Sequence, residues 1–360
     1  MAKRLIIIWL FSMAIMLLAS IPAYADEGYR GDFFIKNFNI NGEKIVNYNL
    51  QYSIVTCDDV MYIPLTPEMC EIYGVEADMD WESNTLTLSK TDPVKKNISD
   101  NWIKNNLQAL SLNEIPGAKA VTLIQGEPDY IYDRVDEAET PPPTVEDIDL
   151  KGAPILEKDK IIYVPLRAIA ESDVFGWDIY YSNYYGVCIS TDGDTPAKTY
   201  FDSGEALENK GLVNYMMNYN GSITPSYGQQ LVFLFKRAGD VYGVDPKLLM
   251  AIAHKESTFN TGSVSRSGAT GMMQVMPATG ARYNLTEEQL KDPKIAIDFA
   301  AMYMSERIAA YNGDWNLALS AYNQGSRSVN RGTNSNVYAN NVMSAYSGIC
   351  NFLEVNGYKM

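Results

Sequence analysis

The amino-acid sequence predicts a multi-domain protein in which a small N-terminal α+β module, built as a degenerate repeat, precedes a mainly α-helical domain. Its 360 residues exceed what one small domain needs. Residues 26–226 carry 15 basic and 34 acidic side chains, a net charge of −19, whereas residues 227–347 carry 11 and 9, a net charge of +2. Strand patterns fill the first part, and apolar residues at helical spacing fill the second. Two units with separate surfaces are therefore expected.

Residues 1–25 have the features of a signal peptide. Lys3 and Arg4 precede an apolar run over 5–18, and small residues lead up to a cleavage site after Ala25. We expect a mature chain beginning at Asp26, with no later membrane segment and an extracytoplasmic, secreted or wall-associated location. A leader that stays uncleaved and anchors the chain is the alternative.

The net charge of −15 excludes most polyanionic partners. A surface this acidic repels phosphate backbones and anionic lipids, so no nucleic-acid partner is expected. The cysteines are too sparse for a disulfide framework, and their spacing matches no zinc site. We expect them to be mostly buried apolar residues, with a Cys57–Cys70 bridge as the alternative; the four are Cys57, Cys70, Cys188 and Cys350.

The acidic part over 33–193 contains an order of elements that occurs twice. A strand-turn-strand pattern with an Asn-Gly turn at 40–45 is followed by strands at 61–65 and 85–88, with a helical stretch between them. The second set comprises residues 150–155, 162–166, a helix over 168–171, and 186–189. The acidic, proline-containing run at 133–149 between the sets is expected to be an extended, solvated insertion.

One block of this part resembles a known module. Tyr163-Val164-Pro165-Leu166-Arg167 is similar to the copper amine oxidase N-terminal-like module, also called a stalk domain, over roughly residues 33–193. The first set has Thr66 where the usual arginine would lie, and the region contains no histidine, the side chain that copper(II) favours. We therefore expect a spacer or adhesion module whose partner is the cell wall or another protein, and no copper.

Residues 194–226 are expected to link the two parts. Their composition, rich in glycine, proline and polar residues, is typical of a loop, with a short helix around 211–219.

A carboxylate completes an apolar helix face in the second part. Asp245 followed by proline predicts a helix start, and the apolar residues at 248, 249 and 252 lie on one face. Glu256 falls on that same face, where partial burial would raise its pKa. Taken alone, such a residue could equally bond a neighbouring loop at the helix end.

The following motifs decide between these interpretations. Glu256-Ser257, the Gly-x-Met-Gln sequence at 271–274 and Ala321-Tyr322-Asn323 occur together in order. The set resembles the soluble lytic transglycosylase (SLT) domain, a lysozyme-like fold that acts on peptidoglycan, over about residues 227–347. The resemblance implies glycan strands as substrate and neither a metal nor another cofactor.

The resemblance also assigns roles by position. Glu256 matches the catalytic acid and base, and the hydroxyl of Tyr338 is expected to reach it. The positions expected to bind substrate are Ser265, Met273, Gln274, Tyr322, Asn323 and Tyr338. The alternatives are a turn cap for Ser265, a core residue for Met273 and a helix C-cap for Asn323. The loop after Gly325 departs from the usual Gly-Pro-Gly, which leaves the details of the subsites open.

A single carboxylate implies a particular mechanism. Most glycosidases use two carboxylates, and no other acidic residue in this part shares a motif with Glu256. One glutamate suffices if it protonates the departing oxygen and then takes a proton from the sugar's own C6 hydroxyl, which closes on C1. A hydrolytic muramidase with an unrecognised second acid and a non-catalytic wall-binding protein are the alternatives.

Overall fold

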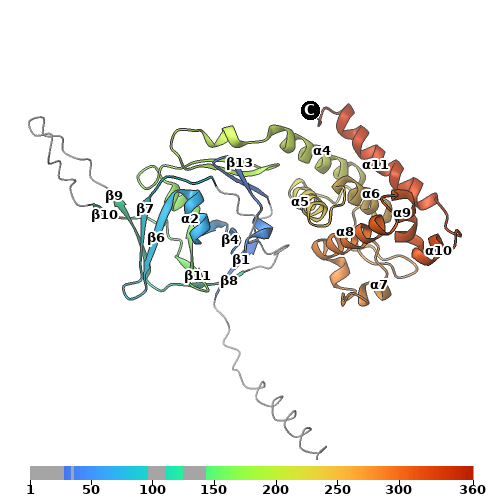
Figure 1. Ribbon diagram of the computed structural model, residues 1–360, viewed down its shortest axis with the longest axis horizontal. Helices are drawn as coiled ribbons and strands as arrows, with labels where there is room; N and C mark the ends of the chain where they lie inside the picture. The colour runs from blue at the N-terminus through green and yellow to red at the C-terminus, as the bar shows by residue number, and fades with distance from the viewer. Residues whose placement is uncertain (1–27, 34–35, 96–109, 125–142, 360) are drawn as a thin grey trace, which may run out of the picture.

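A computed structural model describes residues 28–33, 36–95, 110–124 and 143–359, and it contains a β-rich region followed by a helical domain (Figure 1). The expected signal peptide and the larger part of the acidic insertion lie outside the described residues. The two-part organisation predicted from charge and periodicity is confirmed at this level.

Six antiparallel strands close a barrel in the β-rich region. In pairing order they are β1 (Tyr29–Phe33), β4 (Val55–Cys57), β5 (Val60–Pro64), β12 (Ile161–Pro165), β11 (Leu156–Lys158) and β8 (Leu110–Glu114). Strands β5 and β12 meet in the middle of the order, with Ile63 opposite Val164, and β1 closes the ring against β8. Val55, Leu112 and Leu156 are buried in a small cluster among these strands.

Two four-stranded sheets accompany the barrel. The first contains β10 (Thr144–Asp147), β9 (Lys119–Ile124), β7 (Thr85–Lys90) and β6 (Val75–Asp80), and the second contains β13 (Asp178–Ser182), β14 (Gly186–Ser190), β2 (Asn37–Ile40) and β3 (Glu43–Ile45). In each sheet two antiparallel hairpins are joined by one parallel pair, β7 with β9 and β14 with β2. Each sheet therefore combines one hairpin from the first half of the region with one from the second.

The order of elements is the same in both halves of the region. A strand and two hairpins lead to a short helix, α2 (Pro67–Tyr73) or α3 (Leu166–Ala170), and a third hairpin follows; η1 (Asn47–Asn49) is an additional turn in the first half. The predicted strands at 61–65, 85–88, 162–166 and 186–189 are confirmed within a residue or two. That the halves are copies of one unit stays a prediction.

One element expected in the second half, the strand-turn-strand pattern at 150–155, was wrong. Lys151 and Gly152 have positive φ, as do Asn41 and Gly42 in the β2–β3 hairpin, so the turn signal was genuine. Residues 150–155 nevertheless contain no strand, and the corresponding hairpin is β9–β10. Strand β10 lies in the acidic run at 133–149 that was expected to be an extended, solvated insertion. Its acidic side chains are compatible with a strand because all four of its side chains are exposed while its backbone pairs with β9.

A long helix occupies the expected linker. After η3 (Ala197–Tyr200), helix α4 (Ser203–Tyr219) begins at Asp202, whose side chain accepts from the backbone N–H of Glu205. Leu212, Val213 and Met216 of this helix join the core of the helical domain, whereas Ala206 packs against Tyr185 and Cys188 of the β-rich region. Gly211 suggested a loop, but a Cβ at this position would lie 2.5 Å from Leu353 and Tyr358, so the glycine permits close packing instead.

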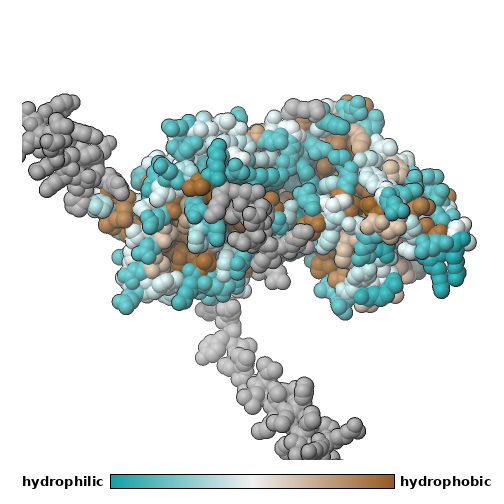
Figure 2. Space-filling model, viewed as in Figure 1, coloured by the Kyte–Doolittle hydropathy of each residue, from teal (hydrophilic) through white to brown (hydrophobic). Residues whose placement is uncertain are grey.

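The helical domain is built around one central helix. Its further elements are α5 (Pro225–Tyr242), α6 (Pro246–Ser257), α7 (Pro277–Ala281), η4 (Gln289–Lys291), α8 (Pro293–Ala310), α9 (Trp315–Gln324), α10 (Ser326–Asn330) and α11 (Val337–Val355). Residues 248–253 of α6 have no exposed surface and pack against α5, α8 and α11. Within the described residues, no helix is both long and apolar enough to cross a bilayer. Hydrophilic residues cover most of the face shown in Figure 2, and hydrophobic residues form small groups between them.

All four cysteines are free thiols. Cys57 and Cys188 are buried, as expected, and Cys70 and Cys350 are partly buried. Burial raises the pKa of the Cys57 and Cys188 thiols to about 11, which keeps them protonated. The alternative of a Cys57–Cys70 bridge is not realised.

Candidate functional site

Glu256 lies in the last turn of α6, where the apolar face of the helix reaches the surface. Asp245 caps the helix start by accepting from the N–H of Lys247, as predicted. The helix stops at Thr258, whose φ of 52° turns the chain away. Ile252, one turn before Glu256, has no exposed surface, whereas Glu256 itself is partly exposed. The core thus fixes the position of a carboxylate that solvent can still reach.

The surroundings of Glu256 favour its protonated form. Burial raises the pKa of its carboxyl group above the usual value, and this effect exceeds the lowering by Tyr338 and Lys255. The Tyr338 hydroxyl, at the start of α11, donates to Glu256 Oε1 over 2.6 Å. Burial and the charge of Glu256 raise the pKa of Tyr338 far above its usual value, so the phenol remains a donor. The predicted contact between these two residues is confirmed in geometry.

Tyr322 connects α9 to the loop after α6. Its hydroxyl donates to the backbone carbonyl of Met273 over 3.2 Å, and its ring lies edge-on to Tyr303 with 5.7 Å between centroids. Burial and the charge of Glu256 raise the pKa of Tyr322 well above its usual value. Tyr322 is therefore a neutral group close to Glu256.

The loop over 263–276 is held by its own hydrogen bonds. Thr270 forms isolated bridges with both Val264 and Val275. Gly271 has a φ of 80°, and a Cβ there would lie 1.9 Å from the carbonyl oxygen of Leu290, so only glycine fits. Gln274 has a φ of 46°, and its Nε2 donates to the carbonyls of Ser263 and Gly271. These bonds fix the orientation of the Gln274 amide.

Three residues expected to bind substrate differ in their exposure and in their hydrogen bonds. Met273 has no exposed surface and belongs to the core, so its side chain offers nothing to a substrate; only its backbone carbonyl takes part, through Tyr322. Ser265 Oγ accepts from the N–H of Ala269 over 2.9 Å, which is the turn-capping arrangement. Asn323 is exposed near the end of α9.

Two supporting residues were missed at the sequence level. Ser257 Oγ donates to the carbonyl of Met272 over 2.8 Å and so attaches the end of α6 to the 263–276 loop. The side chain of Gln324 bonds both backbone groups of Ser335, at 2.7 and 2.8 Å, and thereby holds the segment that leads into α11. Ser257 directly follows Glu256, and Gln324 directly follows Asn323. Their positions next to motif residues were the sequence feature from which a supporting role could have been predicted.

The other carboxylates of this domain have different tasks. Within the described part of the chain, no second carboxylate is among the groups that shift the pKa of Glu256. Asp298 pairs with Arg237, which is fully buried, and Glu306 pairs with Arg307. Three further residues cap helices, namely Asp245, Asp292 and Asp314. Among the described residues, the groups that bond Glu256 or shift its pKa are Tyr338 and Lys255, and neither is a carboxylate.

Part of the helical domain is similar to known proteins. Residues 233–341 match the family model described as the transglycosylase SLT domain. A transglycosylase of Enterobacteria phage PRD1 is 36% identical over 102 residues, which cover 28% of this chain and 37% of that protein. An endo-type membrane-bound lytic murein transglycosylase A of Klebsiella pneumoniae is 34% identical over 96 residues, which cover 24% of this chain and 47% of that protein. This chain thus spans less than half the length of either relative.

A solved structure, the lytic transglycosylase Slt of Pseudomonas aeruginosa as its inactive E503Q mutant, is similar over 46% of this chain and 32% of that chain, with 21% identity and a TM-score of 0.31. The SLT domain predicted from the motifs is confirmed for residues 233–341 by the family match. The likeness of residues 33–193 to a stalk domain stays a prediction.

Proposed function

We propose that this protein is a peptidoglycan lytic transglycosylase. It would cleave the β-1,4 bond between N-acetylmuramic acid and N-acetylglucosamine without consuming water and leave 1,6-anhydromuramyl ends. The observation that carries the proposal is the half-buried Glu256, with a raised pKa and a 2.6 Å bond from Tyr338, in a segment that matches the SLT family.

The proposed reaction uses the Glu256 carboxyl group twice. In its protonated form, which burial favours, it donates its proton to the glycosidic oxygen while the bond from that oxygen to C1 of the muramyl sugar breaks. The resulting carboxylate then accepts the proton of the C6 hydroxyl, whose oxygen bonds to C1. Tyr338 stabilises the carboxylate between these steps because its hydroxyl donates to the charged form. The proton count is balanced, and Glu256 ends protonated.

The neighbouring residues support this reaction in different ways. We assign substrate contacts to Gln274 and Asn323. The Oε1 of Gln274 can accept from a sugar hydroxyl or acetamido N–H, because its Nε2 already donates to Ser263 and Gly271. The Asn323 amide can both donate and accept. Ser265 shapes the 263–276 loop by accepting from the N–H of Ala269, and we assign the remaining donor of its hydroxyl to the substrate. Tyr322 and Tyr338 are positioning residues, since they hold the loop and the carboxylate respectively.

The N-terminal part would place this activity at the wall. An exported chain whose signal peptide is removed would present the β-rich region as a spacer, of the stalk type and built from two copies, between the helical domain and a wall or protein partner. Its acidic surface favours a cationic or neutral partner over a polyanion.

Mass spectrometry of muropeptides released from purified peptidoglycan tests the proposal. We expect products one water lighter than reducing-end muropeptides, and a loss of about 10²- to 10⁴-fold in rate for Glu256→Gln. Glu306→Gln is the matched control, because it removes a half-exposed carboxylate paired with Arg307 on the same domain. Ordinary reducing ends would indicate a hydrolase, and a folded, wall-binding protein without products would indicate a non-catalytic role.

A further inference from the structure

The backbone is strained immediately after the end of α6. Thr258 has a φ of 52° and Phe259 has a φ of 60°, and neither residue is a glycine. Side chains rarely adopt this left-handed region, because Cβ comes too close to the following carbonyl oxygen. Such a conformation persists only where the surrounding structure holds it. Residues 254–259, which we call the Glu256 turn, therefore need support from another part of the protein.

Helix α4 supplies this support. A hydrogen bond of 2.6 Å joins the hydroxyl of Tyr215 to Nδ1 of His254, two residues before Glu256. Asn220, the C-cap of α4, donates from Nδ2 to the carbonyl of Thr258, two residues after Glu256, over 3.0 Å. One helix thus holds the Glu256 turn on both sides of the carboxylate.

Aromatic rings fill the space between α4 and the Glu256 turn. The ring of Phe259 is buried, and its centroid lies 5.6 Å from that of His254 and 6.4 Å from that of Tyr215. The ring of Tyr219, one turn later on α4, lies 4.4 Å from His254. Burial and the charge of Lys255 lower the pKa of His254, so its imidazole is neutral at pH 7. The bonded groups are therefore uncharged and closely packed.

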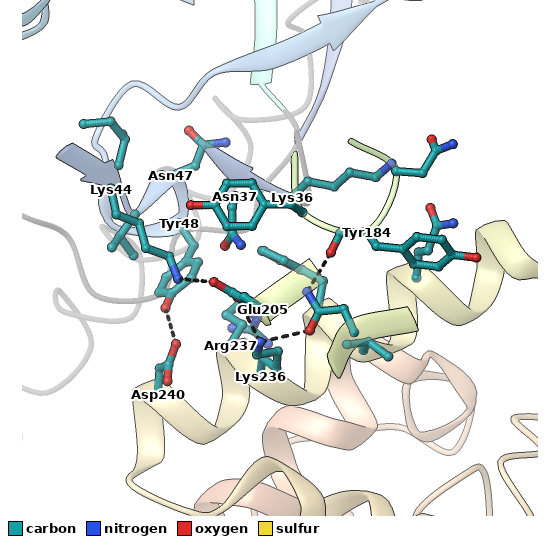
Figure 3. Close-up of a pocket in the computed structure, with 18 of the residues that line it drawn as sticks. Lys36, Asn37, Lys44, Asn47, Tyr48, Tyr184, Glu205, Lys236, Arg237 and Asp240 are labelled. Atoms are coloured by element: carbon teal, nitrogen blue, oxygen red, sulfur yellow. Dashed lines mark hydrogen bonds and ion pairs between the residues drawn. The ribbon is translucent and has the colours of Figure 1, made fainter. Parts of the chain in front are cut away.

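The first half of α4 is fixed at the junction with the β-rich region (Figure 3). Glu205 accepts from Lys236 of α5 over 2.9 Å and from Lys44 of β3 over 3.5 Å, and Figure 3 shows both lysines converging on it. Asn209 donates to the carbonyl of Tyr184 over 2.8 Å. In Figure 1, α4 runs from the β-rich region to the helical domain. A helix held at its first half can act as a fixed support for groups bonded to its second half.

Helix α4 lies outside the segment that matches the SLT family. The match begins at residue 233, in α5, whereas α4 ends at Tyr219. The motifs that predict a role for Glu256 therefore include neither Tyr215 nor Asn220, and support from α4 is not among the roles that the family match assigns.

We propose that Tyr215 and Asn220 are positioning residues for Glu256, because they hold the Glu256 turn on both sides of the carboxylate. Neither residue contacts the substrate in this account. The inference rests on the proposed function, since the position of Glu256 affects turnover only if this residue is the acid and base. A positioning residue acts on the reaction step and not on substrate binding, so its loss should lower kcat and leave KM unchanged.

Steady-state kinetics of the full-length protein on soluble, uncross-linked glycan strands tests this proposal. Tyr215→Phe removes the hydroxyl and keeps the ring. Asn220→Ala removes the amide at a partly exposed position, so it tests the proposal even where a change at the buried Tyr215 prevents folding. We expect kcat per folded enzyme at pH 7 to be about tenfold lower in each variant, with KM unchanged.

The matched controls are Tyr346→Phe and Asn218→Ala. Tyr346 also donates to a residue of the α6 region, Asp245, over 2.7 Å, but at the start of the helix and away from the Glu256 turn. Asn218 is an exposed asparagine of α4, two residues before Asn220. We expect both controls to keep kcat within about twofold of the wild-type value.

Amide hydrogen exchange measures the same support without using the activity. The N–H of Thr258 donates to the carbonyl of His254 over 3.0 Å. The N–H of Phe259 donates to the carbonyl of Ala253 over 3.3 Å, so both amides report the opening of the Glu256 turn. We expect these two amides to exchange about tenfold faster in the two test variants and at the wild-type rate in the two controls.

Three results would overturn the proposal. These are a wild-type kcat in the folded test variants, a fall in kcat that is equal in test variants and controls, and unchanged exchange at Thr258 and Phe259. An inactive wild-type protein whose test variants still exchange faster would refute the proposed function alone. An active wild-type protein whose test variants keep the wild-type kcat would refute this inference alone, so the two proposals fail separately.

Discussion

Replacing Tyr338 by phenylalanine should move the pH dependence of the reaction. The substitution removes the hydroxyl that donates to Glu256 Oε1 over 2.6 Å and leaves the ring in place. A hydrogen bond to a charged group contributes about 1.5–3 kcal/mol, and about 1.4 kcal/mol corresponds to one pKa unit. Since this bond stabilises the ionised form, the pKa of Glu256 should rise by about 1–2 units in the variant.

The sign of the effect on activity follows from the order of the two steps. In the proposed reaction Glu256 begins protonated, so kcat/KM should fall as the pH rises through the pKa of this group. In a plot of kcat/KM against pH, burial already places this descending limb at a pH above the usual pKa range of a glutamate. In Tyr338→Phe the limb should move further upward, by about 1–2 pH units, while the maximal rate falls because the carboxylate formed in the first step loses a donor.

The assay is the release of anhydro-muropeptides from purified peptidoglycan across a range of pH. Tyr346→Phe is the matched control, because Tyr346 lies on the same helix and donates to another carboxylate of α6, Asp245, over 2.7 Å. Both variants lose one hydroxyl bonded to an acid, but only Tyr338→Phe should move the limb. A limb that stays in place, or that moves equally in both variants, would refute this account of Glu256.

Two predictions concern stability. Gly271→Ala should lower the free energy of unfolding by about 2–5 kcal/mol, because a left-handed backbone conformation and a clash with the carbonyl of Leu290 add together. At Gly268 an added Cβ would meet open space, so Gly268→Ala should cost only the backbone term of about 1–2 kcal/mol. Equal losses of unfolding free energy in urea denaturation would contradict the clash. Glu256→Gln should raise the melting temperature at pH 7. The raised pKa means that the folded state disfavours the ionised carboxylate, and this gain should vanish below about pH 4, where the carboxyl is protonated in both states. If thermal scans show a gain in melting temperature for Glu256→Gln at pH 4 but none at pH 7, the ionised Glu256 carboxylate does not destabilise the folded state.

Features set by a few adjacent residues could be predicted from the sequence. The starts of α6 and α9 lie at Asp245 and Asp314, because a side-chain cap followed by apolar residues at helical spacing is a local signal. The β2–β3 hairpin lies at its Asn-Gly turn for the same reason. The position of Glu256 at the end of an apolar face was equally local, and the contact from Tyr338 came from the family resemblance.

Features that depend on distant partners could not be predicted. Strand β7 pairs in parallel with β9, and β14 with β2, and neither partner is encoded near the strand itself. Helix α4 contains a glycine whose packing against the end of α11 is invisible from its own sequence. Met273 shows the same limitation on a smaller scale. A methionine in a loop motif could face either the substrate or the core, and packing against several helices decides for the core.

The site therefore combines two kinds of control over one carboxylate. The position of Glu256 depends on α6, whose preceding residues are so completely buried that the helix cannot shift without disturbing the core. Its pKa is raised by burial and lowered again by the hydrogen bond from Tyr338, 82 residues later in the chain. The segment leading to Tyr338 is held by the bonds between Gln324 and Ser335. A substitution in α6 should thus affect folding and activity together. A substitution in the segment before α11 should change the pH dependence of the proposed reaction while leaving the core intact, so the pH range could be adjusted without rebuilding the fold.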